Sequence, residues 1–230
     1  MQELLGYLRD NAIEAIFPHK CSCGKWGKPL CEACFNSILD TKTELCPFCK
    51  RISEMGRVCS FCRFRTGLTG VMVVGPHEGV LKDSIWRLKY GPIRAISEPL
   101  AEIVVRKYGE FLREKRFTIG FTPTSAHRLT QRGYNQAEEI AKVVGKAAGL
   151  NVESTLARPK EVLHQVGLTR KERLENVVGT ISYIGSEDIL SRKIVIIDDV
   201  YTTGATLEEC AKVLRAAGYR EVWGLVLSRD

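Results

Sequence analysis

Apolar residues follow two different rhythms along the chain, and each rhythm predicts a different kind of element. Short, nearly continuous apolar runs at 68–75, 117–123, 193–198 and 221–228 are typical of strands in a parallel sheet that is buried on both faces. Residues 77–91, 95–115, 135–148 and 207–218 instead place apolar side chains at helical spacing, and Gly149 is expected to cap the third of these helices. Alternating strands and helices indicate an α/β fold with a mostly parallel sheet. A further strand is expected at 179–184.

The first 66 residues have a different texture. After an amphipathic helix at the start there is little periodicity, and so short a segment would need metal to fold. Eight of the nine cysteines of the chain lie here, in one C-x-C and three C-x2-C pairs: Cys21, Cys23, Cys31, Cys34, Cys46, Cys49, Cys59 and Cys62. We therefore expect an N-terminal helix and zinc-binding module at 1–66 and a second domain at 67–230.

Cysteine pairs at this spacing place two thiolates on one side of a metal, and two pairs complete a tetrahedral zinc site. The simplest assignment is sequential, with the first four cysteines around one structural zinc and the last four around another. A cross-braced arrangement is the alternative. Cys210 lies inside a predicted helix and is expected to pack against the sheet without a reactive role.

Bulk properties narrow the function classes only slightly. The net charge of +7 suits a polyphosphate or a nucleic acid, but it also occurs in ordinary soluble proteins. No apolar stretch approaches the roughly 20 residues that span a bilayer. The N-terminus lacks the basic start, continuous apolar core and cleavage site of a signal peptide. We expect a cytoplasmic protein without membrane insertion.

The string KIVIIDDVYTTGAT carries the clearest chemistry in the sequence. Asp198 and Asp199 follow a predicted strand, where an open α/β sheet binds its ligands. The next turn leads into a helix near Thr206, and a helix N-terminus suits a phosphate. The two carboxylates could accept hydrogen bonds from vicinal hydroxyls or hold hydrated Mg²⁺. This pattern predicts a site for a ribose 5-phosphate. The plainer alternative is a capped loop with turn-forming threonines.

IVIIDDVYTTGAT resembles the phosphoribosyl pyrophosphate (PRPP) signature of type I phosphoribosyltransferases. That resemblance implies a parallel sheet flanked by helices, with a small hood over the acceptor. It also implies that Asp198 and Asp199 bind the ribose hydroxyls. The cradle for the 5-phosphate would be formed by Thr202, Thr203, Gly204, Ala205 and Thr206.

Two further strings, QRGYNQAEEIA at 131–141 and HQVGLTRKERLENVVGTI at 164–181, narrow the resemblance. With the cysteine cluster, they make nearly the whole chain similar to the ComF family of competence-associated proteins, also called the GntX type. By position, residues 122–132 would form the pyrophosphate loop and 158–178 a flexible catalytic loop. Their candidate ligands are Thr124, Ser125, Arg128, Arg132, Gln165 and Arg173.

The resemblance implies a Mg²⁺-dependent enzyme that transfers phosphoribosyl from PRPP to an unknown acceptor, in competence or DNA utilisation. Asp198, Asp199, Arg132 and Arg173 would be its catalytic residues. The alternative is a non-catalytic regulatory protein that keeps the PRPP pocket and binds single-stranded DNA and other competence proteins. The DNA would contact cations and one aromatic residue of the cysteine module: Lys25, Trp26, Lys28, Arg51, Arg63 and Arg65. The module could equally be a structural staple or the hood.

Overall fold

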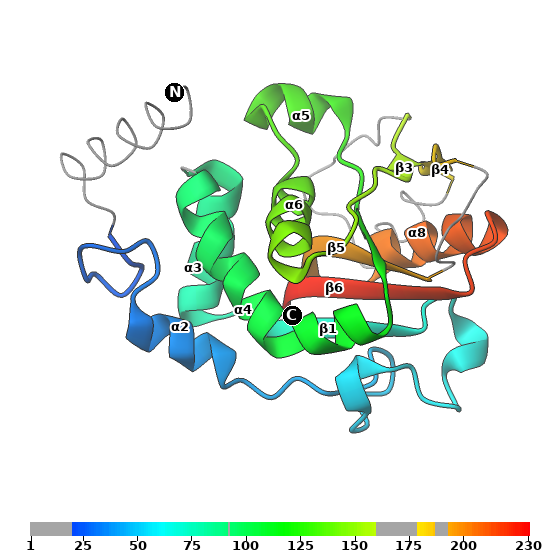
Figure 1. Ribbon diagram of the computed structural model, residues 1–230, viewed down its shortest axis with the longest axis horizontal. Coiled ribbons are helices and arrows are strands. Elements are labelled where there is room, and N and C mark those ends of the chain that lie inside the picture. Colours follow the sequence, from blue (N-terminus) through cyan, green and yellow to red (C-terminus); the bar gives the residue numbers. More distant parts are fainter. Residues whose placement is uncertain (1–19, 92, 160–178, 187–192) are drawn as a thin grey trace.

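A four-stranded parallel sheet forms the centre of the protein (Figure 1). The computed structural model describes residues 20–159 except 92, together with 179–186 and 193–230. The strands are β1 (Gly70–Pro76), β2 (Thr118–Phe121), β5 (Lys193–Tyr201) and β6 (Glu221–Arg229), in the spatial order β1-β6-β5-β2. All three pairings are parallel. The α/β class with a parallel sheet, expected from the apolar runs, is therefore confirmed.

Four of the six described helices lie close to their predicted positions. The six are α2 (Glu32–Leu39), α3 (Gly79–Tyr90), α4 (Ile93–Glu114), α5 (Ala126–Arg132), α6 (Gln136–Ala148) and α8 (Ala205–Ala216), with the 3₁₀ turns η1 (Glu54–Gly56) and η2 (Arg63–Arg65). Gly149 ends α6 with a φ of 67°, which confirms the predicted cap. Helices α2 and α5 were not predicted from the sequence. None of the helices in the described ranges is both long and apolar enough to cross a bilayer.

Two predicted elements differ from the structure or fall outside it. The strand expected at 179–184 is only the two-residue β4 (Ser182–Tyr183), which pairs antiparallel with β3 (Leu156–Ala157) in a separate small sheet. The opening amphipathic helix and residues 160–178 of the expected catalytic loop lie outside the described residues.

Alternate side chains of β1, β5 and β6 enter two different apolar cores, one on each face of the sheet. Val195 and Ile197 of β5 pack in the core that contains buried residues of α3, α4 and α6. Ile194 and Ile196 point the other way, into the core that contains buried residues of α8, including Cys210. Successive side chains of a strand point to opposite faces of the sheet, so a strand that is covered on both faces buries apolar residues on each side in turn.

The cysteine module contributes to both cores. Cys21 and Cys31 belong to the core beneath α3 and α4, whereas Cys46 and Cys62 belong to the core beneath α8. The segment between them runs along β1, the edge strand, as Figure 1 shows. There Thr41 Oγ1 donates a hydrogen bond to the carbonyl oxygen of Val74 at 2.7 Å. The module thus covers an edge that would otherwise be open to pairing. The boundary at residues 66 and 67 stays a prediction.

Candidate functional site

Strand β5 carries the two aspartates beyond the end of its neighbour β2. The last residue of β2, Phe121, pairs with Ile197, whereas β5 continues beside β6 until Tyr201 pairs with Arg229. The sequence suggested that the strand ends before Asp198. It does not, because β6 is long enough to keep pairing with β5. Asp198 and Asp199, the acidic pair, therefore lie at the carboxyl edge of the sheet, where α/β proteins bind their ligands.

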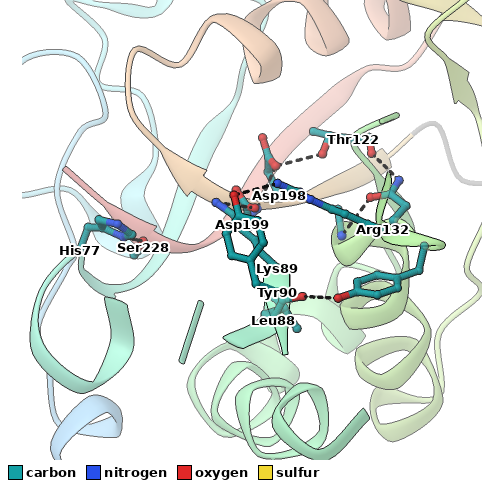
Figure 2. A network of polar contacts seen from close by, with 12 residues as sticks. His77, Leu88, Lys89, Tyr90, Thr122, Arg132, Asp198, Asp199 and Ser228 are labelled. Carbon is teal, nitrogen blue, oxygen red and sulfur yellow. Dashed lines mark hydrogen bonds and ion pairs between the residues drawn. The ribbon is translucent and has the colours of Figure 1, made fainter. Parts of the chain in front are cut away.

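Hydrogen bonds and one ion pair hold the acidic pair in place (Figure 2). Oδ1 of Asp198 accepts hydrogen bonds from Thr122 Oγ1 at 3.0 Å and from the backbone N–H of Asp199 at 2.9 Å. Oδ2 of Asp199 lies 2.9 Å from Lys89 Nζ, which arrives from the end of α3. Burial and the charge of Asp199 raise the pKa of Asp198 to about 7, although the two hydrogen bonds and Lys89 act against this rise. Asp198 can therefore gain or lose a proton near neutral pH.

The acidic pair opens into a polar cavity of about 230 Å³. Its lining includes four cationic side chains against two acidic ones, together with several hydroxyl groups: Lys89, Arg128, Arg132, Arg158, Asp198, Asp199, Thr122, Thr124, Thr202 and Thr206. Asn135 and Gln136, from the start of α6, also line it. An excess of positive charge around a hydroxyl-lined hollow suits a ligand with several phosphate groups.

Three arginines crowd one side of this cavity. The guanidinium of Arg132 lies 5.1 Å from the ring centre of Tyr90, and its Nε is buried without a hydrogen-bond partner in the described part of the chain. Burial and the charge of Arg132 lower the pKa of Arg128, while the acidic pair raises it. Burial and the charge of Arg128 likewise lower the pKa of Arg158, whose Nε donates to Thr180 Oγ1 at 3.4 Å. A bound anion would relieve the mutual repulsion of these guanidinium groups.

Residues 202–206, the threonine turn, join β5 to α8 beside the cavity. Gly204 caps α8 in the left-handed region, with φ of 79°. A Cβ atom at Gly204 would lie only 2.4 Å from Tyr201 Oη, so the turn needs glycine for space as well as for conformation. Thr202 and Thr206 line the cavity. Thr203 Oγ1 instead accepts a hydrogen bond from the backbone N–H of Ala205 at 3.3 Å. The start of α8 offers the N-terminal N–H groups that favour a phosphate.

The structure brings together most of the residues expected from the sequence. Those that line the one cavity are Thr124, Arg128, Arg132, Asp198, Asp199, Thr202 and Thr206. Thr203, Gly204 and Ala205 belong to the adjoining turn rather than to its lining. Ser125 caps α5, where its Oγ accepts from the N–H of Arg128, so residues 122–132 are not a continuous loop as expected. Gln165 and Arg173 lie outside the described residues, and their roles stay predictions.

Sequence reasoning missed two cations of the cavity, Lys89 and Arg158, as binding residues. Lys89 stands among other basic residues at the end of an ordinary amphipathic helix, and no local signal marks it. Asn135 belongs to the QRGYNQ string, and that string was a usable signal. Its Nδ2 donates to the carbonyl oxygen of Thr122 at 2.9 Å and its Oδ1 accepts from the N–H of Ala137. Asn135 thereby ties the start of α6 to the floor of the cavity.

The eight module cysteines form two separate groups, as the sequential assignment predicts. The first cysteine cluster is Cys21, Cys23, Cys31 and Cys34, and the second is Cys46, Cys49, Cys59 and Cys62. Within each cluster all four Sγ atoms lie within 4.8 Å of one another. The Cys23–Cys31 and Cys49–Cys59 Sγ distances are both 3.6 Å. Tetrahedral zinc with Zn–S bonds of about 2.3 Å places its sulfurs about 3.8 Å apart, so both clusters fit a zinc ion.

The electrostatics of the second cluster also favour a thiolate. Burial acts to raise the pKa of Cys46. Hydrogen bonds from the backbone N–H groups of Cys49, Cys59 and Phe48 act in the opposite direction and outweigh burial, so the pKa falls to about 6. N–H groups directed at a sulfur stabilise its charged form, which is the form that binds metal. Cys210 belongs to neither cluster and is buried.

Comparisons with known proteins agree with this picture. No family model matches the sequence. Competence protein F of Haemophilus influenzae is 25% identical over 85% of this chain and 95% of its own. Competence protein ComFC of Streptococcus pneumoniae is 28% identical over 84% of both chains. DNA utilization protein YhgH of Escherichia coli is 25% identical over 88% of this chain and 91% of its own.

One solved structure, of the allosteric regulatory enzyme of purine biosynthesis, aligns with 57% of this chain and 26% of that chain. The TM-score is 0.33 and the sequence identity 17%, and a likeness of that size carries no argument about this protein.

Proposed function

Because the chain belongs to the ComF family, with competence and DNA-utilisation proteins as relatives over most of its length, we propose that it binds PRPP and transfers its phosphoribosyl group during DNA uptake or utilisation. One observation carries this proposal. The acidic pair, the start of α8 and four cationic side chains all border a single cavity at the carboxyl edge of the sheet. A molecule with a diol, a phosphate monoester and a pyrophosphate would use each of these features.

The parts of PRPP distribute over the cavity by charge. The ribose hydroxyls would donate hydrogen bonds to Asp198 and Asp199, since carboxylates only accept. The 5-phosphate would bind the threonine turn at the start of α8. The pyrophosphate would lie against Arg128 and Arg132, whose guanidinium groups can form paired hydrogen bonds with phosphate oxygens.

Transfer would break the bond between ribose C1 and the pyrophosphate oxygen, which leaves with the electron pair. A nitrogen of the acceptor would form the new bond to C1 and lose its proton. Arg128 and Arg132 would stabilise the charge that develops on the leaving group, and the acidic pair would hold the ribose still. Mg²⁺ held by oxygens of PRPP, and through water by Asp198 and Asp199, would supply further neutralisation of the pyrophosphate.

Thermal unfolding in the presence of PRPP and Mg²⁺ tests the binding step. Ligand at 100 times its Kd stabilises by about 2.7 kcal/mol, which is about 5–10 °C for a chain of this size. We expect such a shift for the wild type and none for the Asp198→Asn, Asp199→Asn double variant. Ribose 5-phosphate should give a smaller shift, because it lacks the pyrophosphate. An unshifted wild type would rule out both enzymatic transfer from PRPP and PRPP sensing.

Pyrophosphate release tests the transfer step. The wild type is incubated with PRPP, Mg²⁺ and candidate acceptors, which include free bases, nucleosides and oligonucleotides. We expect one acceptor class to raise pyrophosphate release, and Arg132→Gln to abolish that rise while the thermal stability is retained. Binding without acceptor-dependent release would favour the regulatory alternative.

A second candidate function has its own observation. Two exposed aromatic rings near the second cysteine cluster each have an arginine guanidinium over one face. The guanidinium of Arg51 lies 5.8 Å from the ring centre of Phe61, and that of Arg63 lies 4.8 Å from the ring centre of Phe64. Phe61 is 68% exposed and Phe64 82% exposed. Proteins usually bind single-stranded nucleic acid with aromatic rings, on which the bases stack, and with neighbouring cations, which contact the phosphates. A non-catalytic, DNA-binding competence protein that retains the PRPP pocket would use this surface.

Fluorescence anisotropy with a labelled oligothymidine tests this alternative. Base stacking contributes about 1–3 kcal/mol per base, so removing both rings with Phe61→Ala and Phe64→Ala should weaken binding at least about 30-fold. Asp198→Asn serves as the matched control, because it lies in the other site and should leave DNA affinity unchanged. Wild-type binding that is equally strong to duplex DNA, or unaffected by the two substitutions, would contradict the stacking surface.

A further inference from the structure

Arg229 touches both the second cysteine cluster and the strand that leads into the threonine turn. Its Nη2 donates a hydrogen bond of 2.6 Å to the carbonyl oxygen of Pro47. Pro47 is the residue directly after Cys46, inside the first C-x2-C pair of that cluster. The same guanidinium lies 5.2 Å from the ring centre of Tyr201. The Arg229 side chain therefore links Tyr201 to the backbone beside Cys46, and these two residues are more than 150 positions apart in the sequence.

Tyr201 in turn supports the threonine turn. Its side chain is only 6% exposed, and its register partner in β6 is Arg229 itself. The phenol oxygen lies so close to Gly204 that a Cβ atom there would be 2.4 Å away. The ring thus fills the space against the glycine that starts α8. If the ring moved, the turn would lose the surface on which its left-handed glycine rests.

The carbonyl of Pro47 is held by the local structure of the second cluster. The N–H of Lys50 donates to the carbonyl oxygen of Cys46 at 3.0 Å, and the N–H of Cys46 donates to that of Arg51 at 2.8 Å. These bonds close a tight knuckle around two thiolate ligands. Metal bound by the four cysteines would fix this knuckle and thereby the acceptor that Arg229 uses.

We propose that Arg229 is a positioning residue that couples the second cysteine cluster to the threonine turn, so that metal in this cluster orders the turn and increases its affinity for a phosphate monoester. The expected effect on PRPP affinity rests on the proposed function, whereas the coupling between the cluster and the turn does not. The first cysteine cluster makes a different contact: Arg87 of α3 donates to the carbonyl oxygen of Lys20, beside Cys21. The coupling to the turn belongs to the second cluster.

Hydrogen exchange of the full-length protein, read by mass spectrometry over residues 201–206, tests the coupling without any ligand. We expect Arg229→Gln to speed exchange in this segment about tenfold while the bound zinc, measured per chain, stays unchanged. Removing metal from the wild type with a chelator, or by Cys49→Ser, should speed the same segment equally. In the Arg229→Gln background, metal removal should add little, because the link is already broken.

The matched control is Arg215→Gln. Arg215 also holds the segment between the module and β1, with bonds from Nε to the carbonyl oxygen of Gly67 and from Nη2 to Thr69 Oγ1, but no contact with Tyr201 is found for it in the described structure. This variant should lose thermal stability without faster exchange at 201–206. Unchanged exchange in Arg229→Gln, or metal loss that speeds the turn equally with and without Arg229, would overturn the proposal.

PRPP titration separates the coupling from the proposed function. Couplings between sites commonly change affinity by 5- to 150-fold, and for this single link we expect PRPP to bind Arg229→Gln about 5- to 20-fold more weakly than the wild type. Arg229→Lys keeps the charge and a donor but loses the planar stack, so its affinity should lie between the two. If the wild type does not bind PRPP, the proposed function fails, while the exchange experiment still decides the coupling.

Discussion

The two ends of the parallel sheet both carry cavities lined by cations, but only one end has the features of a phosphate site. The cavity at the carboxyl end measures about 230 Å³. A cavity of about 460 Å³ lies at the amino end, where Lys115, Arg116 and Lys193 surround the starts of β2 and β5. Size alone would select the amino end.

The helices explain the difference between the two ends. Helices α6 and α8 begin beside the carboxyl-end cavity, so their partial positive charge favours an anion there. At the amino end α6 finishes at Gly149, and helix C-termini present carbonyl oxygens that repel an anion. The direction of the helices thus favours an anion at the carboxyl end, although the amino-end cavity is larger and is also lined by cations.

The largest expected contrast comes from removing two positive charges at each end. Arg128→Gln with Arg132→Gln should weaken PRPP binding more than about 100-fold, since each charge-assisted hydrogen bond contributes about 1.5–3 kcal/mol. Lys115→Gln with Arg116→Gln removes the same charge from the amino end and should change the affinity less than about twofold. Calorimetric titration at one ionic strength measures both. Equal losses of PRPP affinity in the two double variants would show that only net charge matters, and that the two ends of the sheet do not differ as binding sites.

Two glycines in the left-handed region provide the next contrast. Gly149, with φ of 67°, has open space where a Cβ would lie, whereas a Cβ at Gly204 would meet Tyr201 Oη at 2.4 Å. Gly149→Ala should therefore cost only the backbone strain of about 1–2 kcal/mol. Gly204→Ala should cost about 2–5 kcal/mol, because overpacking adds to that strain. Urea unfolding gives both values, and equal costs would mean that Tyr201 moves aside freely.

The acidic pair should make stability at the carboxyl end depend on pH. Burial and Asp199 raise the pKa of Asp198 to about 7, above its ordinary value of 3.8. The folded state then holds a proton that the unfolded state releases, so this group's contribution to stability falls as the pH rises from about 4 to about 7. Asp198→Asn removes the effect. We expect its Tm, relative to that of the wild type, to rise by about 5–10 °C between pH 5 and pH 8. A difference that stays constant across this range would show that Asp198 titrates normally.

The smallest effects should come from one ion pair at each end. Lys89 lies 2.9 Å from Asp199 and Lys193 lies 3.6 Å from Glu221, and all four side chains are partly exposed. Pairs of this kind contribute about 0–1 kcal/mol, so Lys89→Met and Lys193→Met should each change the unfolding free energy by less than about 1 kcal/mol. Only Lys89→Met should also weaken PRPP binding, by a few fold. A similar loss of affinity in Lys193→Met would argue against a single phosphate site.

The parts of the site that sequence could predict are those whose signal is local. The apolar run before Asp198, the glycine of the threonine turn and the caps of α6 are each set by neighbours within a few residues, and the structure contains all of them. The grouping of the cysteines is likewise set by short pairs.

The parts that could not be predicted depend on packing between distant elements. The periodicity of α3 shows which of its faces is buried, but not that its last turn brings Lys89 to Asp199. The continuation of β5 to Tyr201 depends on the length of β6. The contributions of the two cysteine clusters to opposite cores likewise require knowledge of where β1 lies in the sheet.

The order of the strands also has a consequence for how the protein is made. Among the described strands β1 is synthesised first, yet the strand it pairs with in the central sheet is β6, which is the last of them. While the nascent chain is still on the ribosome, β1 therefore waits without its partner, with its apolar side chains at risk of aggregation. The cysteine segment leaves the ribosome before β1 and is therefore available to shield β1 until the sheet is complete. Until β6 has been made, the sheet cannot close around the site.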